Sequence, residues 1–146
     1  MRSYTVIAAS VVMFLSAGWE TDFESARAKA AREHKYLLLN FSGSDWCIPC
    51  IRMHKEVFGS EVFRQLADSS LVLYNADFPR LKKNQLSKER QKQNESLADR
   101  YNPRGDFPLT LLLDTDGNVI RRWDGYAEAG AEGFLQQLNT LVHGRH

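Results

Sequence analysis

Residues 46–50 read Trp46-Cys47-Ile48-Pro49-Cys50 and contain both cysteines of this 146-residue chain. The stretch before them, residues 36–41, reads Tyr-Leu-Leu-Leu-Asn-Phe. Such a nearly continuous apolar run is typical of a strand buried on both faces. A polar turn at residues 42–45 separates the two stretches, and a helix is predicted over residues 47–58. The two cysteines are therefore expected where a buried strand passes into a helix.

This position suits thiol chemistry. Cys47 is expected at the helix N-terminus, where unpaired backbone N–H groups and the helix dipole favour a thiolate, the form that attacks disulfides. Cys50, one turn later and further inward, is positioned to attack the resulting mixed disulfide and release the substrate. Pro49 suits the first helical turn, because the N–H that it lacks would have no partner there. Trp46 would shield the pair and offer a polypeptide an apolar surface, and Ile48 is assigned to the same supporting group.

Two other interpretations of the cysteine pair remain open. A structural disulfide is one, although a loop of so few residues gains little stability from being closed. A non-enzymatic metal-binding module is the other, because Cys47, Cys50 and His54 share a helical face. No second Cys/His pair completes a tetrahedral site, so we expect no metal there and favour a redox-active pair.

Helix and strand signals alternate through the rest of the chain. Helices are predicted at residues 22–34, 60–67 and 129–142 and within a solvated stretch at 82–101, and strands at 71–78, 109–113 and 119–123. The last two strands form a hairpin with Asp116-Gly117 at its tip. Strands joined through helices run parallel, and the hairpin adds an antiparallel edge. The predicted fold is an α/β three-layer sandwich, with a mixed central sheet flanked by helices.

The N-terminus is predicted to be a secretory signal peptide, residues 1–18, followed by one domain, residues 19–146. Arg2 precedes an apolar run at residues 4–17, which is too short to span a bilayer as a helix. Small residues at 16–18 suit cleavage before Trp19, although a buried first strand or an uncleaved anchor are the alternatives. The domain is then expected outside the cytoplasm, where disulfides persist.

Composition excludes several classes of protein. The formal net charge is +1, and removal of residues 1–18 takes Arg2 away, leaving 18 basic and 18 acidic side chains. A neutral protein lacks the field that draws others to nucleic acid or anionic lipid. Sixteen aromatic residues (eight Phe, five Tyr, three Trp) exclude disorder, and two cysteines are too few for a disulfide-stapled miniprotein. We expect one compact monomeric domain that binds no nucleic acid.

Taken together, the motifs resemble the thioredoxin superfamily and, within it, the periplasmic thioredoxin-like proteins of the DsbH type. The resemblance covers nearly all of residues 19–146. It is carried by Trp19, the run Phe-Ser-Gly-Ser-Asp-Trp-Cys-Ile-Pro-Cys at 41–50, Asp77-Phe78-Pro79, Gly105-Asp106-Phe107-Pro108, Asp116-Gly117 and Gly125-Tyr126. It implies that Pro108 is a cis-proline facing the two sulfurs. The backbone of Phe107 would then pair with an extended substrate strand beside Cys47.

The function that the resemblance implies is thiol-disulfide exchange with protein substrates. Cys47 would be the attacking and Cys50 the resolving cysteine, with no cofactor beyond their own disulfide. DsbH-type relatives work on the reductase side, so we expect a protein-disulfide reductase in the periplasm, recharged by a membrane electron donor of the DsbD kind. An oxidase or isomerase similar to DsbA or DsbC is the alternative, because the motif alone does not fix the direction.

Two features depart from the thioredoxin pattern. Thioredoxins keep a buried Asp beneath the resolving cysteine and a Lys beside it, and the nearest matches here are Asn40 and Leu73. Asn40 cannot act as a base, so the proton of Cys50 would pass to water or to a carboxylate such as Asp45 or Glu56. The second departure is a charged insertion at residues 80–95, which is either a solvated helix face or a docking surface for an acidic partner.

Overall fold

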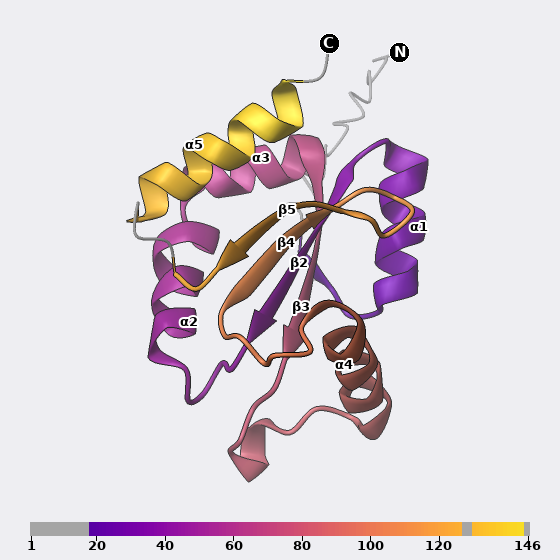
Figure 1. Cartoon of the computed structure of the whole chain (residues 1–146), viewed down its shortest axis with the longest axis vertical. Coiled ribbons are helices and arrows are strands. Elements are labelled where there is room, and N and C mark those ends of the chain that lie inside the picture. The colour runs from indigo at the N-terminus through magenta and orange to yellow at the C-terminus, as the bar shows by residue number, and fades with distance from the viewer. Residues whose placement is uncertain (1–17, 127–129, 145–146) are drawn as a thin grey trace, which may run out of the picture.

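The fold is built on a mixed five-stranded sheet (Figure 1). A computed structural model describes residues 18–126 and 130–144. The strand order is β1-β3-β2-β4-β5, in which β2 runs parallel to β3 and antiparallel to β4, and β5 runs antiparallel to β4. The strands are β1 (Trp19–Glu20), β2 (Tyr36–Ser42), β3 (Leu71–Asp77), β4 (Leu109–Leu113) and β5 (Val119–Asp124).

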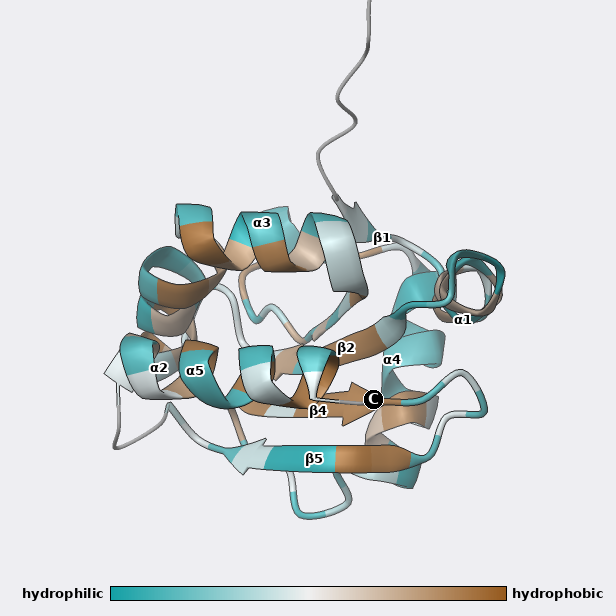
Figure 2. Cartoon of the chain, turned by 90° about the horizontal axis from the view of Figure 1, so that it is seen from above, coloured by the Kyte–Doolittle hydropathy of each residue, from teal (hydrophilic) through white to brown (hydrophobic). Residues whose placement is uncertain are grey.

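Helices cover both faces of this sheet, as Figures 1 and 2 show. They are α1 (Phe23–Glu33), α2 (Ile48–Met53), α3 (Glu61–Ser70), α4 (Lys88–Tyr101) and α5 (Gly130–His143), with a π-helical turn η1 (His54–Phe58) and a 3₁₀ turn η2 (Lys82–Asn84). One core contains residues of α1 and α4, and the other contains residues of α2, η1, α3 and α5. The predicted three-layer α/β sandwich is confirmed.

Strand β2 contributes to both cores because its side chains alternate between the two faces. Leu37, Leu39 and Phe41 lie in the core under α1 and α4, while Leu38 lies in the core under α2, α3 and α5. All four side chains are fully buried. The apolar run that precedes the cysteines is therefore the central strand that its pattern predicted.

Local signals fix where the helices begin. Asp22 caps α1 by accepting a hydrogen bond from the backbone N–H of Ser25 at 2.8 Å, and Ser60 caps α3 in the same way through Phe63. Gly117, with a positive φ of 83°, lies at the tip of the hairpin. The order of elements predicted from residue 22 onward is confirmed.

Three details differ from the predictions. Strand β1 is only two residues long and was not separately predicted, although it pairs in parallel with β3. The helix expected over residues 47–58 is α-helical only as far as Met53 and continues as the π-helical η1. Helix α3 extends to Ser70, three residues beyond the predicted end.

The N-terminal predictions fall largely outside the described part of the chain. Residues 1–17, which hold almost all of the predicted signal peptide, and residue 129, where the last helix was expected to begin, are not among the described residues. The division at residues 18 and 19 therefore stays a prediction. None of the helices within 18–126 and 130–144 is long and apolar enough to cross a membrane.

Candidate functional site

The two cysteines form a disulfide at the start of α2. Cys47 is the N-cap of this helix, and its Sγ accepts a hydrogen bond from the backbone N–H of Cys50 at 3.3 Å. The two Cα atoms lie 5.2 Å apart, and the residues are only 5% and 3% exposed. Pro49 lies in the first turn, where its missing N–H leaves no helical hydrogen bond unmade. An N–H aimed at Cys47 Sγ would stabilise a thiolate there once the disulfide is reduced.

Trp46 directly precedes Cys47 in the chain and is fixed by three contacts. Its Nε1–H donates to the carbonyl of Phe78 at 2.7 Å, its ring meets that of Phe107 edge to face at 5.4 Å, and the Arg80 guanidinium stacks on it at 3.8 Å. The ring also lies so close to Gly43 that a Cβ there would come within 2.2 Å of it. Gly43 is thus the residue that lets Trp46 fold back against the turn.

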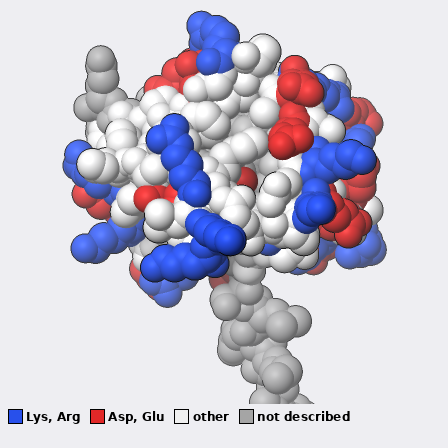
Figure 3. Space-filling model, turned by 90° about the horizontal axis from the view of Figure 1, so that it is seen from below, with Lys and Arg blue, Asp and Glu red and all other residues white. Residues whose placement is uncertain are grey.

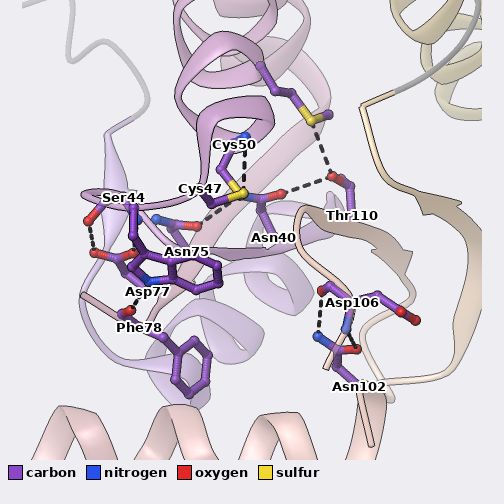
Figure 4. The surroundings of a disulfide bond; sticks show 12 residues. Asn40, Ser44, Cys47, Cys50, Asn75, Asp77, Phe78, Asn102, Asp106 and Thr110 are labelled. Carbon is purple, nitrogen blue, oxygen red and sulfur yellow. Dashed lines mark hydrogen bonds between the residues drawn. A yellow bond between two sulfur atoms is a disulfide. The ribbon is translucent and has the colours of Figure 1, made fainter. Parts of the chain in front are cut away.

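The Phe107–Pro108 peptide bond is cis, as the resemblance implied. The carbonyl of Pro108 accepts the backbone N–H of Gly125 at 2.9 Å. The loop before it is held by Asn102, whose side chain both accepts from the N–H of Asp106 and donates to its carbonyl (Figure 4). Through the ring contact of Phe107 with Trp46, this loop adjoins the turn that carries Cys47.

The beginning of the charged insertion is tied to the turn before Cys47. Asp45 accepts hydrogen bonds from the backbone N–H groups of Arg80 and Leu81, each at 2.9 Å, and from the Asn84 amide at 3.0 Å. The N–H of Arg80 is the main reason that the pKa of Asp45 lies below its ordinary value. We call residues 43–46 together with 78–85 the active-site lip.

The rest of the insertion belongs to α4, which packs on the opposite core through Leu97 and Tyr101. Figure 3 views the molecule from the side on which η2 lies, and positive and negative side chains are interspersed there with uncharged surface between them. Several Lys and Arg side chains lie near one another in the centre of this view, while most Asp and Glu side chains lie on its right. The choice between a solvated face and a docking surface stays open for residues 80–95.

Beneath the disulfide, three neighbouring strands place uncharged polar residues in a row, which we call the polar floor (Figure 4). The Asn40 side chain on β2 donates to Asn75 Oδ1 on β3 at 2.9 Å, and the Thr110 hydroxyl on β4 donates to Asn40 Oδ1 at 2.9 Å. The strand register pairs Asn40 with both partners. The floor contains no carboxylate.

Leu73, the residue matched to the lysine of thioredoxins, does not belong to the polar floor. Leu73 pairs with Leu38, one pleat away from the row, while the residue beside Asn40 is Asn75. Asn75 and Thr110 were both missed in the sequence. A polar residue that interrupts an otherwise apolar strand, as Asn75 does in β3, is the signal that could have indicated them.

A small pocket opens beside Cys50. Its volume is about 150 Å³, and it is lined by Ser42, Ser44, Cys50, Ile51, His54 and Asn75. The two carboxylates suggested as proton acceptors for Cys50 are not among the lining residues. Asp45 is bound to Arg80, Leu81 and Asn84 within the lip. Glu56 accepts a hydrogen bond from the Tyr126 hydroxyl, which lowers the pKa of Glu56 and raises that of Tyr126.

The outer surface of α2 is apolar next to the disulfide. Ile48 is 70% exposed and Ile51 is 46% exposed, so both are available to a polypeptide that approaches the cysteines. Within the described ranges, no three His, Cys, Asp or Glu side chains gather into a group that could hold a metal ion. In this oxidised state, the sulfurs of Cys47 and Cys50 are bonded to each other rather than free as ligands.

Comparison with known proteins identifies similar domains across most of the chain. The thioredoxin-like domain family matches residues 23–141. The disulfide bond reductase DsbH of Chlamydia pneumoniae is 30% identical over 124 residues, which cover 85% of this chain and 72% of that protein. The match to this relative therefore extends over most of both proteins.

Solved structures agree with this assignment. A structure of a DsbH oxidoreductase superposes with a TM-score of 0.77 and 25% identity, covering 99% of this chain and 96% of that one. A thioredoxin from Thermus thermophilus superposes with a TM-score of 0.65 at 18% identity, covering 88% of this chain and 89% of that one. At that lower identity the second match shows the shared fold alone.

Proposed function

The chain belongs to the thioredoxin-like domain family, and from this premise we propose that it is a thiol-disulfide oxidoreductase that works as a protein-disulfide reductase. The observation that carries the proposal is the Cys47–Cys50 disulfide at the helix start, with an N–H aimed at Cys47 Sγ. The long match to a disulfide bond reductase supports the same chemistry and direction.

In the reduced protein, the Cys47 thiolate attacks one sulfur of a substrate disulfide and forms a mixed disulfide, while the other substrate sulfur leaves as a thiolate. The Cys50 thiol then loses its proton and attacks Cys47 Sγ. The internal disulfide forms and the second substrate sulfur leaves, so that two electrons have passed to the substrate. Trp46, Ile48 and Phe107 border the cysteines, and in this proposal they contact the polypeptide around the substrate disulfide.

The two cysteines supply the electrons themselves, so the exchange needs no other cofactor. A dithiol partner must then reduce the Cys47–Cys50 disulfide after each turnover. We assign this role to a membrane electron donor of the DsbD kind and place the protein in the periplasm as a monomer. The predicted signal peptide and the similarity to DsbH support that location.

Insulin reduction by dithiothreitol tests the activity. Residues 19–146 should accelerate it. Cys47→Ser should abolish the acceleration, because no nucleophile remains, and Cys50→Ser should accumulate mixed disulfides detectable by mass spectrometry. Full activity in both variants would refute the assignment of the two cysteines.

The direction needs its own measurement. Equilibration of the cysteine pair with glutathione should give a reduction potential near the ~−270 mV of thioredoxin. Alkylation in cells should trap a mostly reduced pool. A potential near the ~−120 mV of strong oxidants, together with an oxidised pool, would instead indicate an oxidase.

A further inference from the structure

The second step of the exchange requires a proton to leave Cys50, and the polar floor cannot take it. Asn40, Asn75 and Thr110 are neutral groups that donate and accept hydrogen bonds but do not act as bases at physiological pH. Cys50 is 3% exposed, so bulk water has little direct access to its side chain. An ionisable side chain near Cys50 is therefore needed for an efficient transfer.

His54 is the ionisable side chain that shares a pocket with Cys50. Its backbone N–H reaches the carbonyl of Cys50, so the two residues lie one helical turn apart. Side chains with this spacing are neighbours on one helix face. Both line the pocket of about 150 Å³, and the other lining residues, Ser42, Ser44, Ile51 and Asn75, have no group that titrates near neutral pH.

The His54 ring is positioned by aromatic neighbours and remains open to solvent. Its centroid lies 6.3 Å from that of Trp19 on β1 and 6.2 Å from that of Phe58 on η1. The residue itself is exposed. An imidazole in this setting can take a proton from the pocket and exchange it with water outside.

The charged groups around His54 are engaged with other partners. Glu56 on η1 interacts with Tyr126 and Arg52, and Glu20 on β1 pairs with Lys29 at 2.6 Å. On the lip, Asp45 binds Arg80, Leu81 and Asn84, and Asp77 at the end of β3 binds Ser44. Lys55 follows His54 directly in the chain and is exposed. None of these groups lines the pocket.

We propose that His54 is the proton acceptor for Cys50 in the resolving step. A pocket of this size holds a water molecule, and Ser42, Ser44 and Asn75 supply polar partners for it. The proton passes from Cys50 Sγ through this water to the imidazole. The Cys50 thiolate attacks Cys47 Sγ, the Cys47–Cys50 bond forms, and the bond from Cys47 to the substrate sulfur breaks. The imidazolium then gives its proton to solvent, or back to Cys50 when the disulfide is reduced again.

This proposal rests on the proposed function, and a reagent that reports both steps separates the two. One molar equivalent of 5,5′-dithiobis(2-nitrobenzoate) added to the reduced protein releases one coloured thiolate when Cys47 attacks. It releases a second when Cys50 resolves the mixed disulfide. A wild-type protein with no second release would contradict the proposed function itself. The role of His54 is read only from the rate of the second release.

His54→Gln should leave the first release unchanged and slow the second about tenfold or more at pH 7. Acid–base catalysts typically contribute ~10²-fold or more, but part of the Cys50 thiol ionises unaided. The second rate should also depend less steeply on pH in the wild type than in the variant, because the wild-type pocket contains a base for the thiol. In His54→Gln it should rise about tenfold per pH unit throughout, because only ionisation of the thiol remains.

His143→Gln is the matched control, because His143 is exposed at the end of α5 and does not line this pocket. It should leave both releases unchanged. In His54→Ala, added imidazole should restore the second rate, which a purely structural role would not allow. An unchanged second rate and pH profile in His54→Gln, or an equal slowing of both releases, would overturn the proposal.

Discussion

The active-site lip and the polar floor both lie near the same disulfide but are built from different groups. The lip contains the carboxylate of Asp45, which is partly exposed, and the guanidinium of Arg80, which is exposed, and each is fixed by short contacts. The floor contains only the amides of Asn40 and Asn75 and the hydroxyl of Thr110. Charge is therefore placed where water screens it and where it can anchor a loop, and it is absent where burial would make it costly.

This difference separates recognition from chemistry. The lip shapes the surface that a polypeptide meets next to Cys47, through the ring of Trp46. The floor supports Cys50 without supplying a base, which leaves proton transfer to the pocket side, where His54 lies. Substitutions in the two regions should consequently affect different steps.

The largest effect is expected from placing a charge in the floor. Asn40 is 4% exposed, so Asn40→Asp would bury a carboxylate beside two neutral partners. At neutral pH we expect the free energy of unfolding to fall by roughly 2 to 4 kcal/mol. Burial should raise the pKa of the new carboxyl in the folded state. The loss should therefore be full above that raised pKa and should disappear as the pH falls below the carboxyl's ordinary value.

Urea unfolding at pH 8 and at pH 5 measures this pH dependence. Asn139→Asp is the control, because Asn139 is exposed on α5 and should change little at either pH. A loss of stability in Asn40→Asp that is the same at both pH values would show that the new carboxylate is not buried in a neutral site. The contrast between lip and floor would then fail.

An intermediate effect is expected from disturbing the lip at Gly43. In Gly43→Ala the new methyl group would overlap the Trp46 ring, which must shift and so disturb its contacts with Phe107 and with the carbonyl of Phe78. We expect a loss of roughly 1 to 3 kcal/mol in unfolding free energy, as for overpacked sites. The value of kcat/KM for insulin should fall several-fold, while the reaction with a small aromatic disulfide should change less than twofold.

Trp46→Phe should cause a milder form of the same loss in insulin reduction. It keeps an aromatic ring near Phe107 but removes the Nε1–H donor to Phe78, so its loss in insulin reduction should be smaller than that of Gly43→Ala. Equal losses with insulin and with the small disulfide in Gly43→Ala would contradict a role of the lip in polypeptide recognition.

The sequence was sufficient for the elements that carry the cysteines and insufficient for the polar floor. The apolar run of β2, the helix start at Cys47 and the hairpin each follow from patterns within a few residues, and these were predicted correctly. The partner of Asn40 depends on the register between β2 and β3, which local patterns do not specify. Leu73 lies on the same face of β3 as Asn75 but one pleat, about 7 Å, earlier along the strand.

The contacts of the charged residues were also beyond local patterns. Asp45 and Glu56 are close to the cysteines in the sequence, and both were considered as bases for Cys50. Asp45 is instead bound to backbone groups 35 and 36 residues later, and Glu56 to a tyrosine 70 residues later. Sequence proximity to Cys50 did not indicate these contacts, while His54, first considered as a metal ligand, lines the pocket.

The smallest effect is expected from Asp45→Asn, which tests whether charge holds the lip. The carboxylate accepts three hydrogen bonds, and its pKa is lowered in the folded protein, chiefly by the N–H of Arg80. A lowered pKa means that the stabilising contribution is complete above the ordinary value for Asp and is lost as the pH falls through the lowered value. In the wild type, NMR signals of the Arg80 and Leu81 amides should shift together in that acidic range. In Asp45→Asn the transition should be missing, and hydrogen-exchange protection of both amides at pH 7 should decrease because a neutral amide oxygen is a weaker acceptor.

Asp116→Asn, at an exposed position of the hairpin turn, should leave the Arg80 and Leu81 signals unchanged. If the transition persisted in Asp45→Asn, another group would be holding the lip, and its order would not depend on the Asp45 charge.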